Sequence, residues 1–125
     1  FASLAVIAAE IDASRTSFLV VPLLFFNFIF DTMFTFCRRL LRGENVTQAH
    51  RTHLYQLLNQ LGWSHVQVSL FQYFVTATQG IGALALIGYG PDSRILVFLP
   101  FLAFQIVYAV IVISAARRCG VITRA

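Results

Sequence analysis

The sequence is poor in charge and has no lysine. Only 11% of its 125 residues are charged, whereas 58% are hydrophobic. An ordinary soluble domain carries about 25% charged residues, and a soluble fold of this composition would have too little polar surface to cover its core. The scarcity of charge therefore excludes an ordinary soluble domain and indicates an integral membrane protein. We expect membrane lipid around it and no nucleic-acid partner.

Three hydrophobic runs are long enough to cross a bilayer: residues 18–37, 66–88 and 95–116. A helix rises about 1.5 Å per residue and needs about 20 residues to cross roughly 30 Å of hydrocarbon. We predict an all-α fold, a polytopic transmembrane helix bundle in a single domain (residues 1–125), with a polar loop at residues 38–65. A shorter apolar run at residues 1–9 reads as a partial span, so we expect a larger protein with an upstream part.

The arginines concentrate on one predicted side of the membrane. Seven of the nine follow the first or the last of the three spans: Arg38, Arg39, Arg42, Arg51, Arg117, Arg118 and Arg124. The positive-inside rule then places the loop at residues 38–65 and the C-terminus in the cytoplasm. In that reducing compartment we expect Cys37 and Cys119 to be free thiols.

Polar residues recur at helical spacing within the predicted spans. One set lies at steps of three and four residues and so shares one helix face: Asn27, Asp31, Thr35, Arg38 and Arg42. An aspartate at mid-bilayer costs about 2.5–3.5 kcal/mol on insertion scales, so this face should point into the bundle or towards the loop. Asp31 there either clamps neighbouring helices or supports a site. A second stripe is typical of helix packing: Ser69, Gln72, Thr76, Gln79 and Ala83.

The loop combines arginine, histidine and amide side chains. Residues 48–61 have a helical pattern with a stripe of leucines, and Gly62 can end that helix. We predict an amphipathic helix that lies against the membrane face of the bundle. His50 and His53 then belong to its first turn, where free backbone N–H groups favour anions. Arg51 adds a side chain suited to bidentate phosphate contacts, so the loop predicts a phosphate-binding site.

Two other functions compete for this loop. Its helix can anchor to anionic lipid headgroups in a non-enzymatic membrane assembly or transporter subunit. Alternatively, His50 and His53 can share a metal ion with His65. No cysteine or carboxylate completes that set and its spacing matches no common zinc pattern, so we predict no metal site.

Two motifs connect the first long span to the loop. D-T-x-x-x-x-x-R-R-L-x-R-G stands at residues 31–43, and A-H-R-T-H-L-Y-Q stands at residues 49–56, followed by Gly62–Trp63. In order and spacing they resemble the polyprenyl-phosphate N-acetylhexosamine-1-phosphate transferases (glycosyltransferase family 4). This family includes undecaprenyl-phosphate N-acetylglucosamine-1-phosphate transferase and phospho-MurNAc-pentapeptide translocase. The opening F-A-S-L-A-V-I-A-A-E is also similar to the helix that follows the family's G-D-x-G-S motif.

The resemblance implies the C-terminal part of a multi-pass enzyme of the bacterial inner (plasma) membrane. Such an enzyme moves a sugar 1-phosphate from a UDP-N-acetylhexosamine to a polyprenyl phosphate such as undecaprenyl phosphate, which initiates lipopolysaccharide or cell-wall synthesis. The family's Mg²⁺ is held by acidic motifs that would lie upstream of Phe1. The resemblance therefore assigns no catalytic residue to this sequence, which alone should be inactive, and it leaves a homodimer open.

The resemblance also implies roles for individual residues. It assigns binding of the substrate phosphates to His53, Arg51 and His50. His53 matches the first histidine of the family's H-x-H-H series, which continues here with Tyr55 and Gln56 in place of histidines. His50 stands where many members have aspartate, and these departures bear on the sugar rather than on the reaction. Supporting roles fall to Gln56, Arg38, Arg39 and Asp31.

Overall fold

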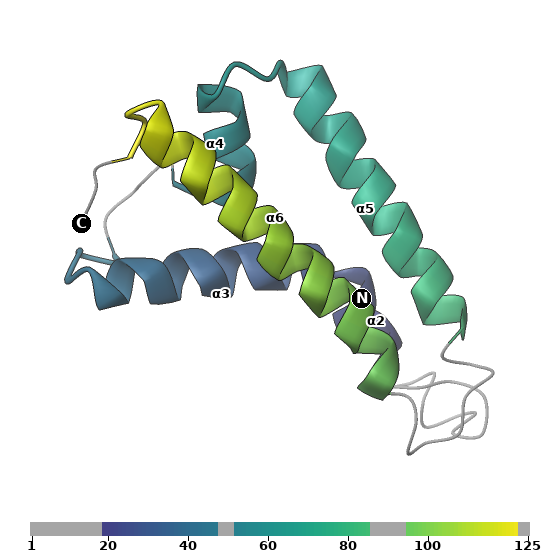
Figure 1. Cartoon of the computed structure of the whole chain (residues 1–125). Coiled ribbons are helices and arrows are strands. Elements are labelled where there is room, and N and C mark those ends of the chain that lie inside the picture. The colour runs from purple at the N-terminus through teal and green to yellow at the C-terminus, as the bar shows by residue number, and fades with distance from the viewer. Residues whose placement is uncertain (1–18, 48–51, 86–94, 123–125) are drawn as a thin grey trace.

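The computed structural model describes residues 19–47, 52–85 and 95–122, which form helices and their connections without a strand (Figure 1). The helices of these residues are α2 (Val20–Leu24), α3 (Phe26–Leu41), α4 (Leu54–Gln60), α5 (His65–Ala85) and α6 (Phe98–Arg118). The predicted all-α class is confirmed for this part of the chain. The partial span predicted at residues 1–9 lies outside the described residues.

One helix in the described part of the chain is long and apolar enough to cross a membrane. It comprises 24 residues, Ile95–Arg118, and contains α6 and the short turn before it. Its bounds agree with the run at residues 95–116 that the sequence predicts to be a span. The described structure thus contains one candidate membrane-spanning helix.

The apolar run at residues 18–37 is two helices rather than one. It divides at Phe25, where the backbone leaves the helical region with φ −96° and ψ 8°. Pro22 lies in the first turn of α2, where its missing N–H is not needed. Hydropathy is continuous across Phe25 and gives no sign of this break.

α3 continues past residue 37, the end of the predicted span, and Gly43 ends it just after the arginines. Gly43 has φ 66°, and its N–H donates to Leu40 O at 3.0 Å. The N–H of Glu44 donates to Arg39 O at 3.0 Å. This pair of bonds is the Schellman ending that glycine favours. Arg38 and Arg39 therefore belong to the last turn of α3, where positive charge suits the helix dipole.

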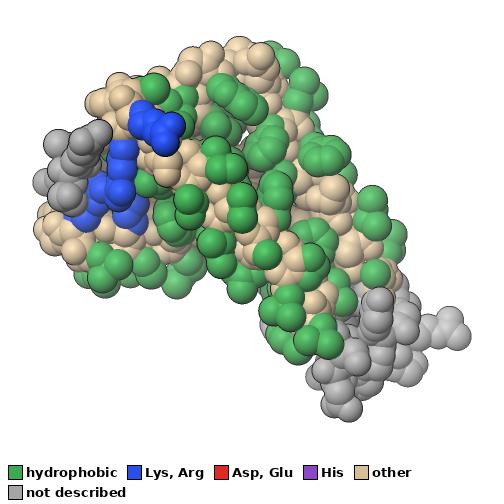
Figure 2. Space-filling view, in the orientation of Figure 1, with side chains coloured by type: hydrophobic (Ala, Val, Ile, Leu, Met, Phe, Trp, Pro, Cys, Tyr) green, Lys and Arg blue, Asp and Glu red, His purple; other side chains and the backbone are tan. Residues whose placement is uncertain are grey.

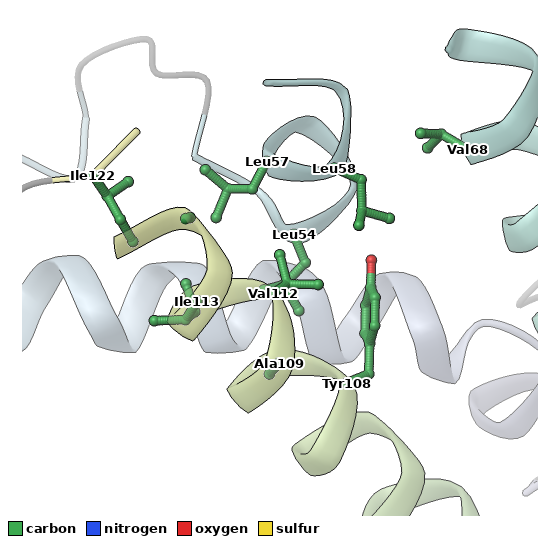
Figure 3. Packing of buried hydrophobic residues seen from close by; sticks show 10 residues of the cluster. Leu54, Leu57, Leu58, Val68, Tyr108, Ala109, Val112, Ile113 and Ile122 are labelled. Carbon is green, nitrogen blue, oxygen red and sulfur yellow. The ribbon is translucent and has the colours of Figure 1, made fainter. Parts of the chain in front are cut away.

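α4 is shorter than the helix predicted over residues 48–61, because it begins only after His53. Its leucines, Leu54, Leu57 and Leu58, are buried against α6 (Figure 3). The helix ends at Gly62 as predicted, with φ 100° and a bond from Trp63 N–H to Leu58 O at 3.1 Å. A helix of seven residues is marginal in isolation. Its packing on α6 therefore accounts for its stability.

The polarity of α3 is reversed relative to a helix of a soluble protein. Its buried residues are all polar: Asn27, Asp31, Thr35 and Arg39. Its exposed face carries large apolar side chains, among them Phe28, Ile29, Met33 and Phe36. Exposed apolar side chains also follow α5 and α6, and hydrophobic groups cover much of the surface in Figure 2. Such an exterior suits a hydrocarbon environment.

The predicted polar stripes are reproduced in part. On α3 the inward face passes through Asn27, Asp31 and Thr35 as predicted, but it continues to Arg39, while Arg38 and Arg42 are half-buried. On α5, Gln79 and Ala83 are buried, whereas Ser69 is exposed and Gln72 and Thr76 are half-buried.

Candidate functional site

Asp31 connects α3 to the beginning of α4. Its Oδ1 accepts hydrogen bonds from Leu54 N–H at 2.8 Å and from Thr35 Oγ1 at 3.2 Å. The same oxygen lies 3.6 Å from His53 Nδ1. Asp31 is 8% exposed, so these contacts replace the water that a carboxylate would otherwise bind. A negative charge here also suits the positive end of the α4 dipole.

The sequence analysis placed His53 in the first turn of the loop helix. In the structure His53 is instead the N-cap of α4. Its backbone is extended, with φ −63° and ψ 151°, and its N–H donates to Gln56 Oε1 at 3.3 Å. The imidazole stacks on Tyr55 with ring centroids 6.0 Å apart. Held between Asp31 and Tyr55, the ring is 25% exposed. His53 is therefore a positioned side chain that keeps an accessible edge.

A small cavity of about 190 Å³ lies between α3 and the start of α4. It is lined by Thr32, Thr35, Phe36, Arg39, Val46 and His53. A second cleft, of about 410 Å³, opens on the other side of α4. It is lined by Tyr55, Gln56, Asn59, Gln60 and His65. His53 and His65 thus face different spaces.

Three arginines of α3 and its end are anchored in different ways. Arg39 Nε donates to Glu44 Oε2 at 3.1 Å, and Arg39 Nη2 donates to Asn45 O at 2.5 Å. Arg42 Nη1 lies 3.8 Å from Glu44 Oε1. Arg38 instead donates through Nη2 to Thr52 O at 2.9 Å. Arg38 therefore ties α3 to the chain just before α4.

The end of α6 adds positive charge to the same end of the molecule. Burial, followed by the nearby charge of Arg42, lowers the pKa of the Arg38 guanidinium, and Arg117 acts in the same direction. Figure 2 shows arginine side chains gathered at this end of the visible face. Two arginine groups that are far apart in the sequence, one after each predicted span, therefore come together in space.

The structure brings together some of the predicted site residues. Asp31, His53 and Arg39 meet around the small cavity, and Arg38 lies beside the chain leading into α4. Gln56 caps α4 through His53 but lines the second cleft. His50 and Arg51, to which the resemblance assigns phosphate contacts, lie outside the described residues.

Neither carboxylate of the site fits a magnesium ion. Asp31 is engaged by Leu54 and His53, and Glu44 by Arg39 and Arg42. Within the part of the chain that the structure describes, no three His, Cys, Asp or Glu side chains gather as a metal site. The cysteines at 37 and 119 are free and exposed.

A buried amide network was not predicted from the sequence. Gln105 Nε2 of α6 donates to Asn27 Oδ1 at 2.8 Å, and Asn27 Nδ2 donates to Gln72 Oε1 of α5. The network joins three helices beneath the site. A lone glutamine in an apolar span was the available signal, because an amide in hydrocarbon needs a partner.

Comparison of the chain with protein-family models, with curated proteins and with solved structures finds no match.

Proposed function

We propose that this chain is part of a membrane transferase that moves a sugar 1-phosphate from a UDP-N-acetylhexosamine to a polyprenyl phosphate. The observation that carries the proposal is the pairing of Asp31 with His53 at the head of α4, beside the arginines of α3. Phosphoryl transfer depends on positioning and on positive charge more than on covalent chemistry of the protein. The geometry supplies both.

The small cavity beside His53 defines what these residues would hold. Its volume of about 190 Å³ is below the roughly 300–1,000 Å³ of pockets that enclose whole small molecules. We therefore assign it one phosphoryl group and not the complete nucleotide sugar. Arg39 supplies positive charge to this cavity, and the edge of the His53 ring supplies a directional hydrogen bond.

The membrane setting is part of the proposal. We propose that the chain belongs to a polytopic bundle in which α3, α5 and α6 cross the bilayer. The arginine-rich end of this bundle would face the cytoplasm. The apolar exterior and the inward polar face of α3 support this arrangement. Mg²⁺ would be held by residues of the enzyme outside this chain, as the family resemblance implies, since both described carboxylates are engaged.

The alternative of a non-enzymatic membrane subunit is favoured by one observation, the arginine-rich end, which suits anionic lipid headgroups. The burial of the α4 leucines argues against a freely lipid-anchored helix, because no apolar stripe is left on α4 for the membrane. The transferase requires the His53 side chain for turnover, whereas a non-enzymatic subunit does not.

The test is the release of UMP by the intact membrane protein that contains this chain. His53→Ala should lower kcat by about 10²–10³-fold, the usual effect of removing one positioned group that stabilises charge. His65→Ala is the matched control, because His65 lines the other cleft. Near-normal turnover in the His53→Ala protein, with insertion intact, would favour the non-enzymatic subunit.

A further inference from the structure

The guanidinium of Arg38 has more donors than partners. Its Nη2 is bonded to Thr52 O, but its Nε and Nη1 are buried and have no hydrogen-bond partner among the described residues. Buried donors are nearly always satisfied, and leaving one without a partner costs about 1–3 kcal/mol, or more on a charged group. These two N–H groups therefore call for an acceptor.

The neighbours of Arg38 have the same deficit. Arg42 Nη2 and Thr52 Oγ1 are also buried without a partner in the described part of the chain. Arg38 contacts Thr52 directly, and Arg42, at the C-terminal end of α3, lies one helical turn after Arg38. Three guanidinium nitrogens and one hydroxyl thus lie in one region without acceptors.

Charge is unbalanced in the same region. Glu44 pairs with Arg39 at 3.1 Å and with Arg42 at 3.8 Å. Within the described residues no carboxylate lies within 4.0 Å of Arg38, while Arg117 of α6 adds a further positive charge nearby. The helix dipole and the positive-inside rule explain why arginines occur at this end. They do not explain why guanidinium N–H groups are turned inward and buried.

We propose that Arg38, Arg42 and Thr52 form an oxyanion site that binds a phosphate group. Arginine suits this ligand because its planar N–H groups match two phosphate oxygens at once. The site is distinct from the cavity beside His53, which Arg38 does not line. It does not depend on the transferase reaction, since a phosphate can bind where none is transferred.

Two sources can supply such a group: a lipid phosphate at the membrane surface or a soluble phosphate. The first arm of the test titrates inorganic phosphate into the protein in an uncharged detergent at constant ionic strength and follows binding by calorimetry. The second arm compares thermal unfolding in nanodiscs of phosphatidylcholine alone and with added phosphatidic acid. No nucleotide sugar is present, so failure here is separate from failure of the proposed reaction.

Arg38→Gln should weaken binding by about tenfold or more, as expected for the loss of a charge-assisted hydrogen bond. Arg117→Gln should weaken it by a smaller factor. Arg118→Gln is the control matched to Arg117→Gln, because both variants remove one positive charge from the last turn of α6. Arg118→Gln should leave the affinity for phosphate within about twofold of the unmodified protein. Should Arg38→Gln fail to fold, Arg42→Gln replaces it.

The two arms name the source of the phosphate. Binding of inorganic phosphate that is lost in Arg38→Gln supports a soluble source. Stabilisation only by phosphatidic acid, again lost in Arg38→Gln, supports a lipid source. The proposal is overturned by the absence of an effect dependent on Arg38 or Arg42 in both arms, or by an equal loss in Arg118→Gln.

Discussion

At the residue scale, Asp31 shows both the reach and the limit of the sequence. Helical spacing placed it on the inward face of its helix, and the structure confirms its burial. Its partner is the N–H of Leu54, 23 residues further on. Periodicity describes one helix at a time, so it cannot identify a contact between two helices. The sequence predicted that Asp31 either clamps neighbouring helices or supports a site, but only the fold shows that the segment it holds is the start of α4.

Replacing Asp31 tests this clamp. Asp31→Ala removes the acceptor for Leu54 N–H and the partner of His53, so we expect a loss of about 1–3 kcal/mol of stability, the range for a cap or a charged hydrogen bond. Asp31→Asn keeps a carbonyl oxygen and should lose less. Unfolding in detergent, followed by circular dichroism, measures both against Thr32→Ala, whose side chain is exposed. Equal stability of Asp31→Ala and Thr32→Ala would contradict the clamp.

At the scale of the element, the sequence predicted helices well and their ends unevenly. Gly62 ends α4 as expected, because a glycine after a periodic stretch is a direct local signal. The break at Phe25 was missed because apolar residues continue on both sides. The start of α4 was misplaced because its N-terminus is fixed by Asp31, a residue of another helix. Local chemistry thus predicts helix ends only where the cause is itself local.

The amide network that links α3, α5 and α6 should contribute measurably to their packing. We expect Gln105→Leu to lower the free energy of unfolding by about 0.5–2 kcal/mol, the range found for hydrogen bonds between membrane helices. A double-mutant cycle with Asn27→Leu isolates the direct contact of 2.8 Å. Ser114→Ala serves as control, because Ser114 is exposed on the same helix. Strictly additive effects in the cycle would show that the two amides do not interact.

At the scale of the whole molecule, an apolar exterior is combined with arginines gathered at one end. Composition alone predicted membrane residence, and arginine counting predicted which end faces inward. Neither could predict that Arg117 would lie near Arg38, because that proximity depends on how α6 packs on α4 and α3. The sequence thus predicted part of the membership of the candidate site, but not its geometry.

The orientation can be measured with Cys119, which is free and exposed at the end of α6. In a Cys37→Ser background, a membrane-impermeant maleimide should label Cys119 in inside-out vesicles and not in right-side-out ones. Ser93→Cys, in the turn between the predicted spans at residues 66–88 and 95–116, should show the opposite pattern once Cys119 is replaced by serine. Labelling of Cys119 from the outer face would reverse the proposed topology.

The dependence of α4 on its surroundings has a consequence for biogenesis. Its seven residues are capped by a carboxylate from α3, and its leucines are covered by α6. A ribosome releases α3 and α4 well before α6. The segment bearing His53 therefore has Asp31 available from the start, but its leucines have no α6 to pack against until later. We therefore expect the packing around α4 to be completed only after α6 has been synthesised.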